Sequence, residues 1–179
     1  MNLLILPGNS PRHREWLRDA QKALAPFFDN ILTLEYRHWD FANKKTDVDY
    51  EAKAAKELVS GWKEYVVLAK SIGTVIATTA HTQGKLKASS YVFLGLPLPL
   101  VKDDLNFYPQ LQALENVVIF QNSHDPFGSS NAVGQYIASG NAKIEVIETP
   151  GSTHDYVDFV TYASYLTGDP STKHSFPHK

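Results

Sequence analysis

The sequence of 179 residues predicts an α/β protein, a three-layer α/β/α sandwich around a six-stranded, mostly parallel sheet. Short apolar runs rich in strand-forming residues alternate with longer stretches of helical spacing, which is typical of a parallel sheet covered on both faces. Proline and glycine follow four of the apolar runs, at the points where loops should begin. Each of these loops follows the C-terminal end of a predicted strand, where open α/β sheets bind their ligands.

The individual elements are predicted from the spacing of apolar residues. We expect strands at residues 2–6, 30–35, 65–69, 90–94, 116–121 and 143–148. Between them we expect helices at residues 12–25, 48–61, 72–81, 109–114, 129–139 and 156–166. In the second helix, Ala52, Ala55, Leu58 and Val59 recur at three- and four-residue spacing, which predicts one apolar stripe facing the sheet.

Length and composition indicate one domain over residues 1–168, followed by a C-terminal tail, 169–179, that has no periodic pattern. A formal net charge of −2 argues against a surface that binds nucleic acid. The chain has no cysteine, which excludes disulfides, thiolate nucleophiles and cysteine-based zinc sites. The histidines outside the motifs described below show no i,i+4 pairing, so we expect neither a metal nor a cofactor.

The start of the chain has no basic leader, and its apolar run stops before Pro7. That run is too short for the hydrophobic region of a signal peptide. No later segment reaches the length of a membrane span. We therefore expect a soluble, cytoplasmic protein that does not associate with membranes.

A short motif at residues 69–73, Ala-Lys-Ser-Ile-Gly, carries the strongest functional signal. A buried-strand pattern precedes it and a helical pattern follows it, which is the setting of a nucleophile elbow. Such a turn brings strand and helix backbones close together, so the positions two residues either side of the serine must be small. Ala69 and Gly73 meet this requirement.

Two further polar residues follow later predicted strands, and their order along the chain indicates the class of hydrolase. Asp125 comes after the fifth predicted strand and His154 after the sixth. The order Ser71, Asp125, His154 is that of α/β-hydrolases and differs from the chymotrypsin and subtilisin orders. Residues 125–128 and 150–154 resemble the acid and histidine loops of the dienelactone-hydrolase-like branch of that superfamily. The resemblance covers nearly the whole chain and implies a compact hydrolase without a lid.

The resemblance implies a role for each of these residues. Ser71 would be the nucleophile, His154 the general base, and Asp125 the carboxylate that orients the imidazole. A serine hydroxyl needs such a base because it is a weak nucleophile at neutral pH. Histidine suits the task because its unperturbed pKa, about 6.5, lets it take and return a proton near neutrality.

A tetrahedral intermediate also needs hydrogen-bond donors for its oxyanion. The elbow would supply the backbone N–H of Ile72. In related hydrolases the second donor comes from the loop after the strand that is here residues 2–6, where a His-Gly pair is common. This chain has Pro7-Gly8 there, so Asn9 is the candidate, with Ser10 behind it.

Several residues beside these motifs are candidates for the substrate pocket. They are Ser10, Lys70, Leu96, Pro97 and Phe127. Lys70 precedes the serine, and we expect a solvated cation there because lysine is rarely buried, although it could instead attract an anionic substrate. The segment 94–100, with Phe107 and Tyr108, could line an acyl pocket or could be core followed by a rigid loop.

Other acidic and histidine residues compete for the same roles. Asp155 directly follows His154, and we expect it to cap the helix that follows. Asp103 and Asp104 lie after the fourth strand, where a few hydrolases place their acid. We expect His124 in a loop near the pocket, since neighbours on an extended segment point to opposite sides.

The sequence thus predicts a serine hydrolase that cleaves small or medium carboxylic esters, or related acyl bonds, through an acyl-enzyme. Its partner would be a small acyl substrate. The alternative is a catalytically silent, hydrolase-shaped binding protein, favoured by Lys70 in the elbow and by the missing histidine before Gly8. An exposed edge strand at 143–148 could also pair two copies into a homodimer.

Overall fold

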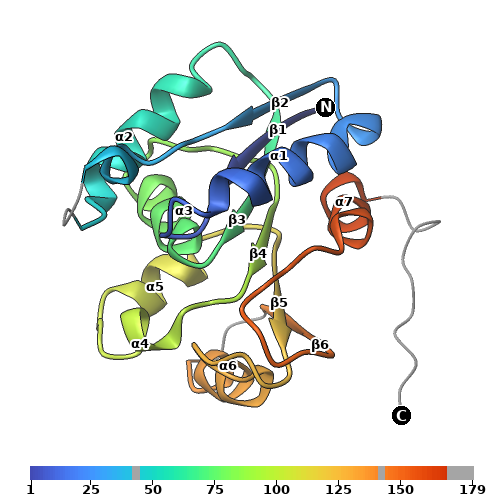
Figure 1. Ribbon diagram of the computed structural model, residues 1–179. Coiled ribbons are helices and arrows are strands. Elements are labelled where there is room, and N and C mark those ends of the chain that lie inside the picture. The colour runs from blue at the N-terminus through green and yellow to red at the C-terminus, as the bar shows by residue number, and fades with distance from the viewer. Residues whose placement is uncertain (42–44, 141–143, 169–179) are drawn as a thin grey trace.

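The computed structural model describes residues 1–41, 45–140 and 144–168, which form one sheet with helices on both faces (Figure 1). The strands are β1 (Asn2–Leu6), β2 (Asn30–Thr33), β3 (Tyr65–Lys70), β4 (Tyr91–Leu94), β5 (Val117–Asn122) and β6 (Glu145–Thr149). The helices are α1 (His13–Leu24), α2 (Val48–Leu58), α3 (Ile72–Thr82), α4 (Leu98–Val101), α5 (Phe107–Gln112), α6 (Ser130–Ala138) and α7 (Phe159–Thr167). Two short 3₁₀ helices cover Ala25–Phe27 and Arg37–Asp40. The predicted three-layer α/β fold is confirmed.

The sheet has the strand order β2-β1-β3-β4-β5-β6, and every neighbouring pair is parallel. Strands covered on both faces need apolar side chains on both sides, so they read as continuous apolar runs. This explains β3, in which all six residues are buried. It also explains β1, in which four consecutive residues, 3–6, are fully buried.

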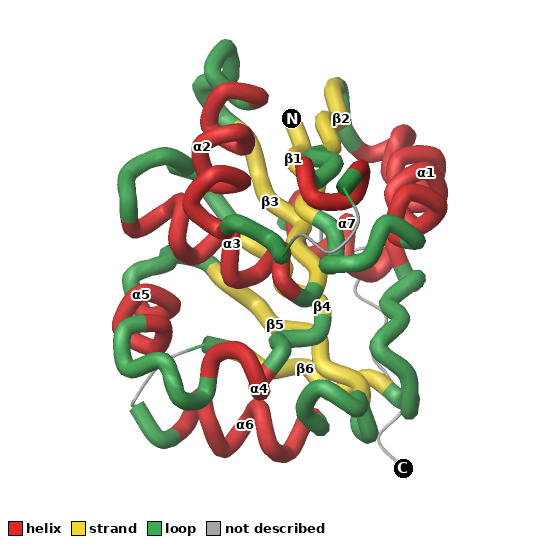
Figure 2. The backbone as a smooth tube through the Cα atoms, turned by 60° about the vertical axis from the view of Figure 1, so that its left-hand side comes forward, coloured by secondary structure: helices red, strands yellow, loops and turns green. Residues whose placement is uncertain are grey.

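Helices α1 and α7 cover one face of the sheet, and α2, α3 and α5 cover the other (Figure 2). Strands β1 and β3 are neighbours, yet the helices that follow them lie on opposite faces. After β1 the chain therefore turns toward one face of the sheet, and after β3 it turns toward the other. In open α/β sheets this arrangement opens a crevice at the C-terminal ends of the two strands.

Helix α2 shows how the sequence pattern positions an element. Ala52, Ala55 and Val59 are buried and Leu58 is packed against the core, as the predicted stripe requires. Asp47 caps the start of the helix, because its side chain accepts a hydrogen bond from the Tyr50 N–H.

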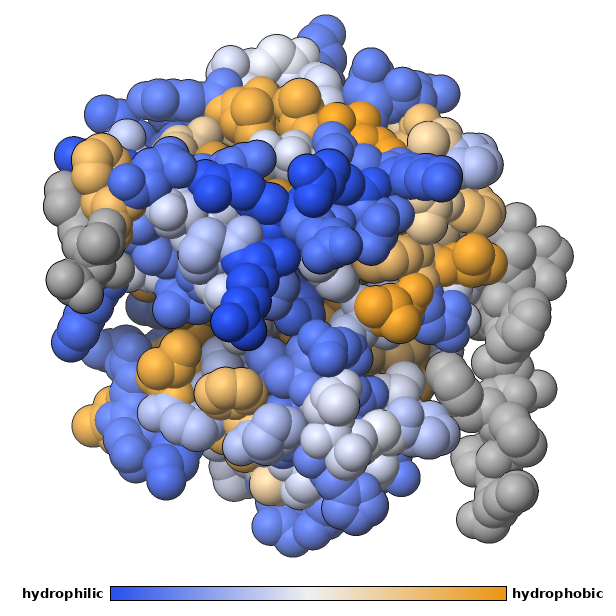
Figure 3. Space-filling view, in the orientation of Figure 1, coloured by the Kyte–Doolittle hydropathy of each residue, from blue (hydrophilic) through white to orange (hydrophobic). Residues whose placement is uncertain are grey.

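Polar side chains cover most of the molecular face seen in Figure 3. Within the described ranges, we found no helical segment with the length and apolar character that crossing a lipid bilayer requires.

The observed elements differ from the predicted ones mainly at their ends. Helix α7 begins at Phe159, and Asp158 caps it by accepting a hydrogen bond from the Thr161 N–H. The prediction that Asp155 caps this helix is wrong, because the chain stays irregular up to residue 158. The short helix α4 lies where we expected a pocket wall or a rigid loop. Lys143, at the start of the last predicted strand, and the tail at 169–179 lie outside the described residues.

Strand β1 and helix α3 approach each other closely at Gly73. A Cβ atom on Gly73 would lie 2.4 Å from the backbone oxygen of Leu6 and 2.8 Å from that of Pro7. Backbone atoms of a central strand cannot move aside as a flexible side chain can. Only glycine therefore lets the first turn of α3 rest on the end of β1.

We expect Gly73→Ala to lower the free energy of unfolding by about 1–3 kcal/mol, because the added methyl group overpacks a rigid contact. Urea unfolding followed by circular dichroism would measure the change. Gly134→Ala is the matched control: Gly134 lies inside α6 with open space around its Cα, so alanine should stabilise the protein by about 0.5–1 kcal/mol. Equal stability of Gly73→Ala and the wild type would contradict the close approach.

Candidate active site

Ser71 occupies the sharp turn between β3 and α3. Its backbone has φ 54° and ψ −122°, and among the described residues only Asn116 is another non-glycine residue with positive φ. Such a conformation strains an L-residue and persists only where the surroundings hold it. Here the Ser71 N–H donates to the Leu94 carbonyl, at 2.9 Å, and the Ser71 carbonyl accepts from Thr74. This is the backbone geometry of a nucleophile elbow.

Asp125 and His154 meet beside this turn. The His154 Nδ1 atom lies 2.6 Å from Oδ2 of Asp125, whose side chain is fully buried. The other carboxylate oxygen accepts the Phe127 N–H at 2.8 Å. A buried carboxylate next to Nδ1 favours the tautomer that carries its hydrogen there, which leaves Nε2 as a proton acceptor. Within the described part of the chain, Nε2 is buried and has no hydrogen-bond partner.

Tyr156 is a third member of this cluster that the sequence reasoning missed. Its hydroxyl donates to Oδ2 of Asp125 at 2.6 Å and accepts the Asn122 N–H at 3.1 Å. Burial, with the hydrogen bond to Asp125, raises the pKa of Tyr156 well above its usual range, so the hydroxyl keeps its proton. The sequence reasoning missed Tyr156 because its contact with Asp125 joins residues 31 positions apart in the chain.

The His154 ring is fixed by packing as well as by its hydrogen bond. A Cβ on Gly95 would lie 2.6 Å from Cε1 of His154, so the ring rests directly on the backbone after β4. On another side the Phe127 ring packs against it, with ring centroids 4.7 Å apart. The imidazole is therefore held between two loops that come from different strands.

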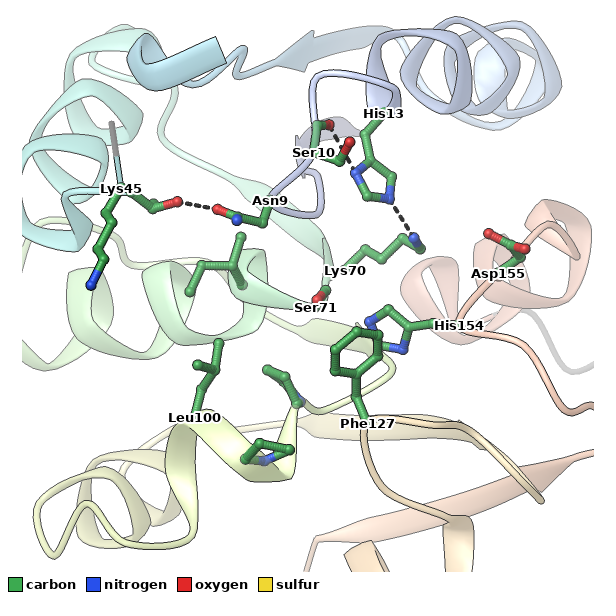
Figure 4. Close-up of a pocket in the computed structure, with 14 residues that line it drawn as sticks. Asn9, Ser10, His13, Lys45, Lys70, Ser71, Leu100, Phe127, His154 and Asp155 are labelled. Carbon is green, nitrogen blue, oxygen red and sulfur yellow. Dashed lines mark hydrogen bonds between the residues drawn. The ribbon is translucent and has the colours of Figure 1, made fainter. Parts of the chain in front are cut away.

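Ser71 and His154 line one pocket of about 730 Å³ (Figure 4). Its other lining residues come from the C-terminal end of β3, from the loops and helices that follow the strands, and from the segment before α2. They are Asn9, Ser10, His13, Lys45, Thr46, Lys70, Ile72, Pro97, Pro99, Leu100, Phe127 and Asp155. The pocket thus opens at the crevice that the sheet topology predicts.

The structure brings most of the predicted site residues to this pocket. Asp125 does not line it and lies behind His154, bonded to its far nitrogen. Leu96 does not line it either, although we expected it to: its side chain is fully buried, and its N–H donates to the Gln121 side chain at 2.8 Å. The segment expected as a pocket wall contributes Pro97, Pro99 and Leu100.

Asn9 lies in the loop after β1, opposite the elbow. Its backbone carbonyl lies 2.9 Å from Nε1 of Trp39 and 2.8 Å from Nε2 of His38. Its side-chain oxygen accepts a hydrogen bond from the Thr46 hydroxyl. The 3₁₀ helix at Arg37–Asp40 and the segment before α2 therefore hold this loop from outside.

Lys70 is buried, and the expectation of a solvated cation is wrong. Only 1% of its surface is exposed, and its Nζ lies 2.7 Å from Nε2 of His13. Burial lowers the pKa of Lys70 to about 8, although the carboxylates of Asp155 and Asp125 partly offset this effect. The lysine is the last residue of β3, so its stem lies among core side chains.

The competing candidates lie elsewhere. Asp103 and Asp104 are exposed and His154 bonds to Asp125 instead. His124 is exposed and lies next to the Ser123 hydroxyl, 3.1 Å from it, rather than in the pocket lining. Asp155, which does not cap a helix, lines the pocket.

A family model described as the alpha/beta hydrolase domain matches residues 40–165, more than half of the chain. Comparison with curated protein sequences gave no match.

Solved structures share the fold at low sequence identity. A YdeN-like hydrolase from Pectobacterium atrosepticum is 17% identical with a TM-score of 0.64, over 96% of this chain and 86% of its own. An α/β serine hydrolase without a lid from Xanthomonas campestris is 12% identical with a TM-score of 0.66, over 98% and 84%. The type II thioesterase BorB of the borrelidin biosynthetic cluster is 14% identical with a TM-score of 0.66, over 93% and 91%.

Likeness at these identities shows the fold, and the match to the family model extends across most of the elements that build the pocket. The predicted superfamily is therefore confirmed: the chain belongs to the α/β-hydrolases and has the fold of a hydrolase of that type.

Proposed function

We propose that the protein is a serine hydrolase that cleaves small or medium carboxylic esters through an acyl-enzyme. The observation that carries the proposal is the His154 ring: it is bonded to buried Asp125 through Nδ1, while Nε2 has no partner among the described residues. That ring lines the same pocket as Ser71, the residue with the strained elbow backbone. Acyl transfer needs an imidazole whose one nitrogen is fixed by a hydrogen bond and whose other nitrogen can take the proton of a nearby serine hydroxyl.

The proposed reaction has two halves. Ser71 Oγ attacks the ester carbonyl carbon as His154 Nε2 takes its proton, and the carbonyl oxygen becomes an oxyanion held by the backbone N–H groups of Ile72 and Asn9. The bond from that carbon to the alkoxy oxygen then breaks, and His154 returns the proton to the leaving alcohol. Water next attacks the acyl-enzyme with His154 again as base, which releases the carboxylic acid and restores Ser71.

The pocket supports the binding of an apolar acyl chain. Its volume of about 730 Å³ is in the usual range for small-molecule sites, and Pro97, Pro99, Leu100 and Phe127 line part of it. Leu100 and Phe127 are 60% and 48% exposed and both line the pocket, so they offer apolar surface to a substrate there. Among the solved structures, the carboxylesterase of Bacillus cereus shares the fold at 16% identity and a TM-score of 0.55.

The alternative is a binding protein of the same shape without catalysis. One observation favours it: no hydrogen bond joins Ser71 to His154 among the described residues. Catalytic hydrogen bonds are often long in unliganded enzymes and shorten when substrate binds, so this observation does not exclude the enzyme. Covalent labelling separates the two functions.

We expect a fluorophosphonate probe to label the wild-type protein at Ser71, because the probe reacts only with an activated serine. Ser71→Ala should abolish labelling and ester turnover while the circular dichroism spectrum stays unchanged. Ser60→Ala changes an exposed serine outside the pocket and serves as the control that keeps labelling. A folded wild-type protein that never labels would assign the binding function instead.

We expect kcat/KM for p-nitrophenyl esters to rise from acetate to medium-chain acyl groups, because the apolar residues that line the pocket bury the added methylene groups. Each buried methylene is worth about 0.8 kcal/mol, or about fourfold in kcat/KM. Leu100→Asp should remove this gain, whereas Leu105→Asp, on a 90% exposed leucine outside the pocket lining, should keep it. A profile without dependence on chain length would show that the acyl chain binds elsewhere.

A further inference from the structure

The buried Lys70 connects the elbow to the loop after β1. Lys70 directly precedes Ser71, and its Nζ reaches across to His13, the first residue of α1, at 2.7 Å. The same Nζ lies 5.7 Å from the centre of the Trp16 ring. Within the part of the chain that the structure describes, no carboxylate lies within ion-pair distance of this ammonium group. A buried cation without such a partner is costly, which indicates that it serves a purpose.

The His13 ring donates one hydrogen bond and accepts another. Burial, with the positive charge of Lys70, lowers the pKa of His13 to about 4, so its ring is neutral near pH 7. Nδ1 lies 3.0 Å from the Ser10 carbonyl oxygen and must donate to it. Nε2 therefore has a free lone pair and accepts from the Lys70 ammonium (Figure 4). The ring links the end of β3 to the backbone of residue 10.

The same ring also packs on Gly8. A Cβ at position 8 would lie 2.5 Å from Cε1 of His13, so only a glycine there admits the imidazole. His13 thus holds the loop at Gly8 by contact and at Ser10 by a hydrogen bond. Asn9, the proposed second oxyanion donor, lies between these two points. Its carbonyl is held from the other side by Trp39 and His38.

We propose that Lys70 and His13 are positioning residues, which hold the loop with Asn9 at a fixed place relative to Ser71 so that the two oxyanion donors stay aligned. The inference rests on the proposed function for the meaning of that alignment. The inference also explains how the loop after β1 is held in place without the His-Gly pair that is common in related hydrolases. Here the histidine that steadies the loop comes from α1, and a lysine of the elbow anchors it.

Direct binding of substrate by Lys70 is the main competing explanation. Against it, the lysine is 1% exposed, and the carboxylate of Asp155 lies on the same pocket and would repel an anionic group. A positioning role needs no exposure. The two explanations differ in which kinetic parameter changes and for which esters.

The experiment compares Lys70→Met, Lys70→Arg and His13→Phe with the wild-type protein. Methionine and phenylalanine keep most of the packing but cannot form the hydrogen bonds. We expect each to lower kcat for p-nitrophenyl butyrate about 10- to 100-fold with KM changed less than about threefold, because a displaced donor acts mainly in the transition state. Lys70→Arg should recover most of the loss, and His81→Phe, whose ring bonds to Tyr91 outside the pocket, is the control.

Two further readouts make the result decisive. Since both residues act through one connection, the double variant Lys70→Met/His13→Phe should lose no more than either single variant. Amide hydrogen exchange at residues 8–10 should become at least about tenfold faster in each variant while exchange in β3 is unchanged, which tests the loop without relying on activity.

Unchanged exchange at residues 8–10 together with wild-type kcat in folded variants would overturn the proposal. So would a loss confined to KM for an ester with a carboxylate on its acyl chain, such as a hemisuccinate, because Lys70 would then bind substrate. If Lys70→Met does not fold, His13→Phe decides by the same criteria. Failure of the proposed function itself is recognised separately, by a wild-type protein that does not react with the fluorophosphonate.

Discussion

The contact between the end of β1 and the first turn of α3 is the constraint on which the site depends. Because Gly73 rests on the carbonyls of Leu6 and Pro7, the loop after β1 and the elbow after β3 are forced to share one crevice. The parallel sheet makes them neighbours, and opposite helix directions keep the space between them open. The loops after β5 and β6 then bring Asp125 and His154 to the same rim.

The fold, and which residues meet at the candidate site, could be predicted because both depend on local sequence patterns. Ser71 lies in a strand-turn-helix pattern, and Asp125 and His154 each lie in the loop that follows a predicted strand. Residues whose surroundings come from distant segments could not be predicted in this way. The Lys70 ammonium contacts His13, which is 57 positions away, and Tyr156 bonds to Asp125 across 31 positions.

Two of the incorrect local predictions have physical reasons of the same kind. Asp155 is a good helix cap by residue type, but Asp158 lies where the backbone turns into α7 and takes that role. Leu96 follows a strand at the correct end of the sheet, yet its side chain is buried in the core. Segment position predicts which loop reaches a site, whereas side-chain direction depends on packing that the sequence does not display.

The backbone of residue 71 limits which amino acids could carry out the proposed chemistry. At φ 54° a β-branched side chain collides with its own main chain. Threonine has the same hydroxyl group as serine but is excluded from this turn by its extra methyl group. Cysteine, which is unbranched, would fit. A cysteine at position 71 would therefore keep the conformation of this turn, whereas a threonine would strain it.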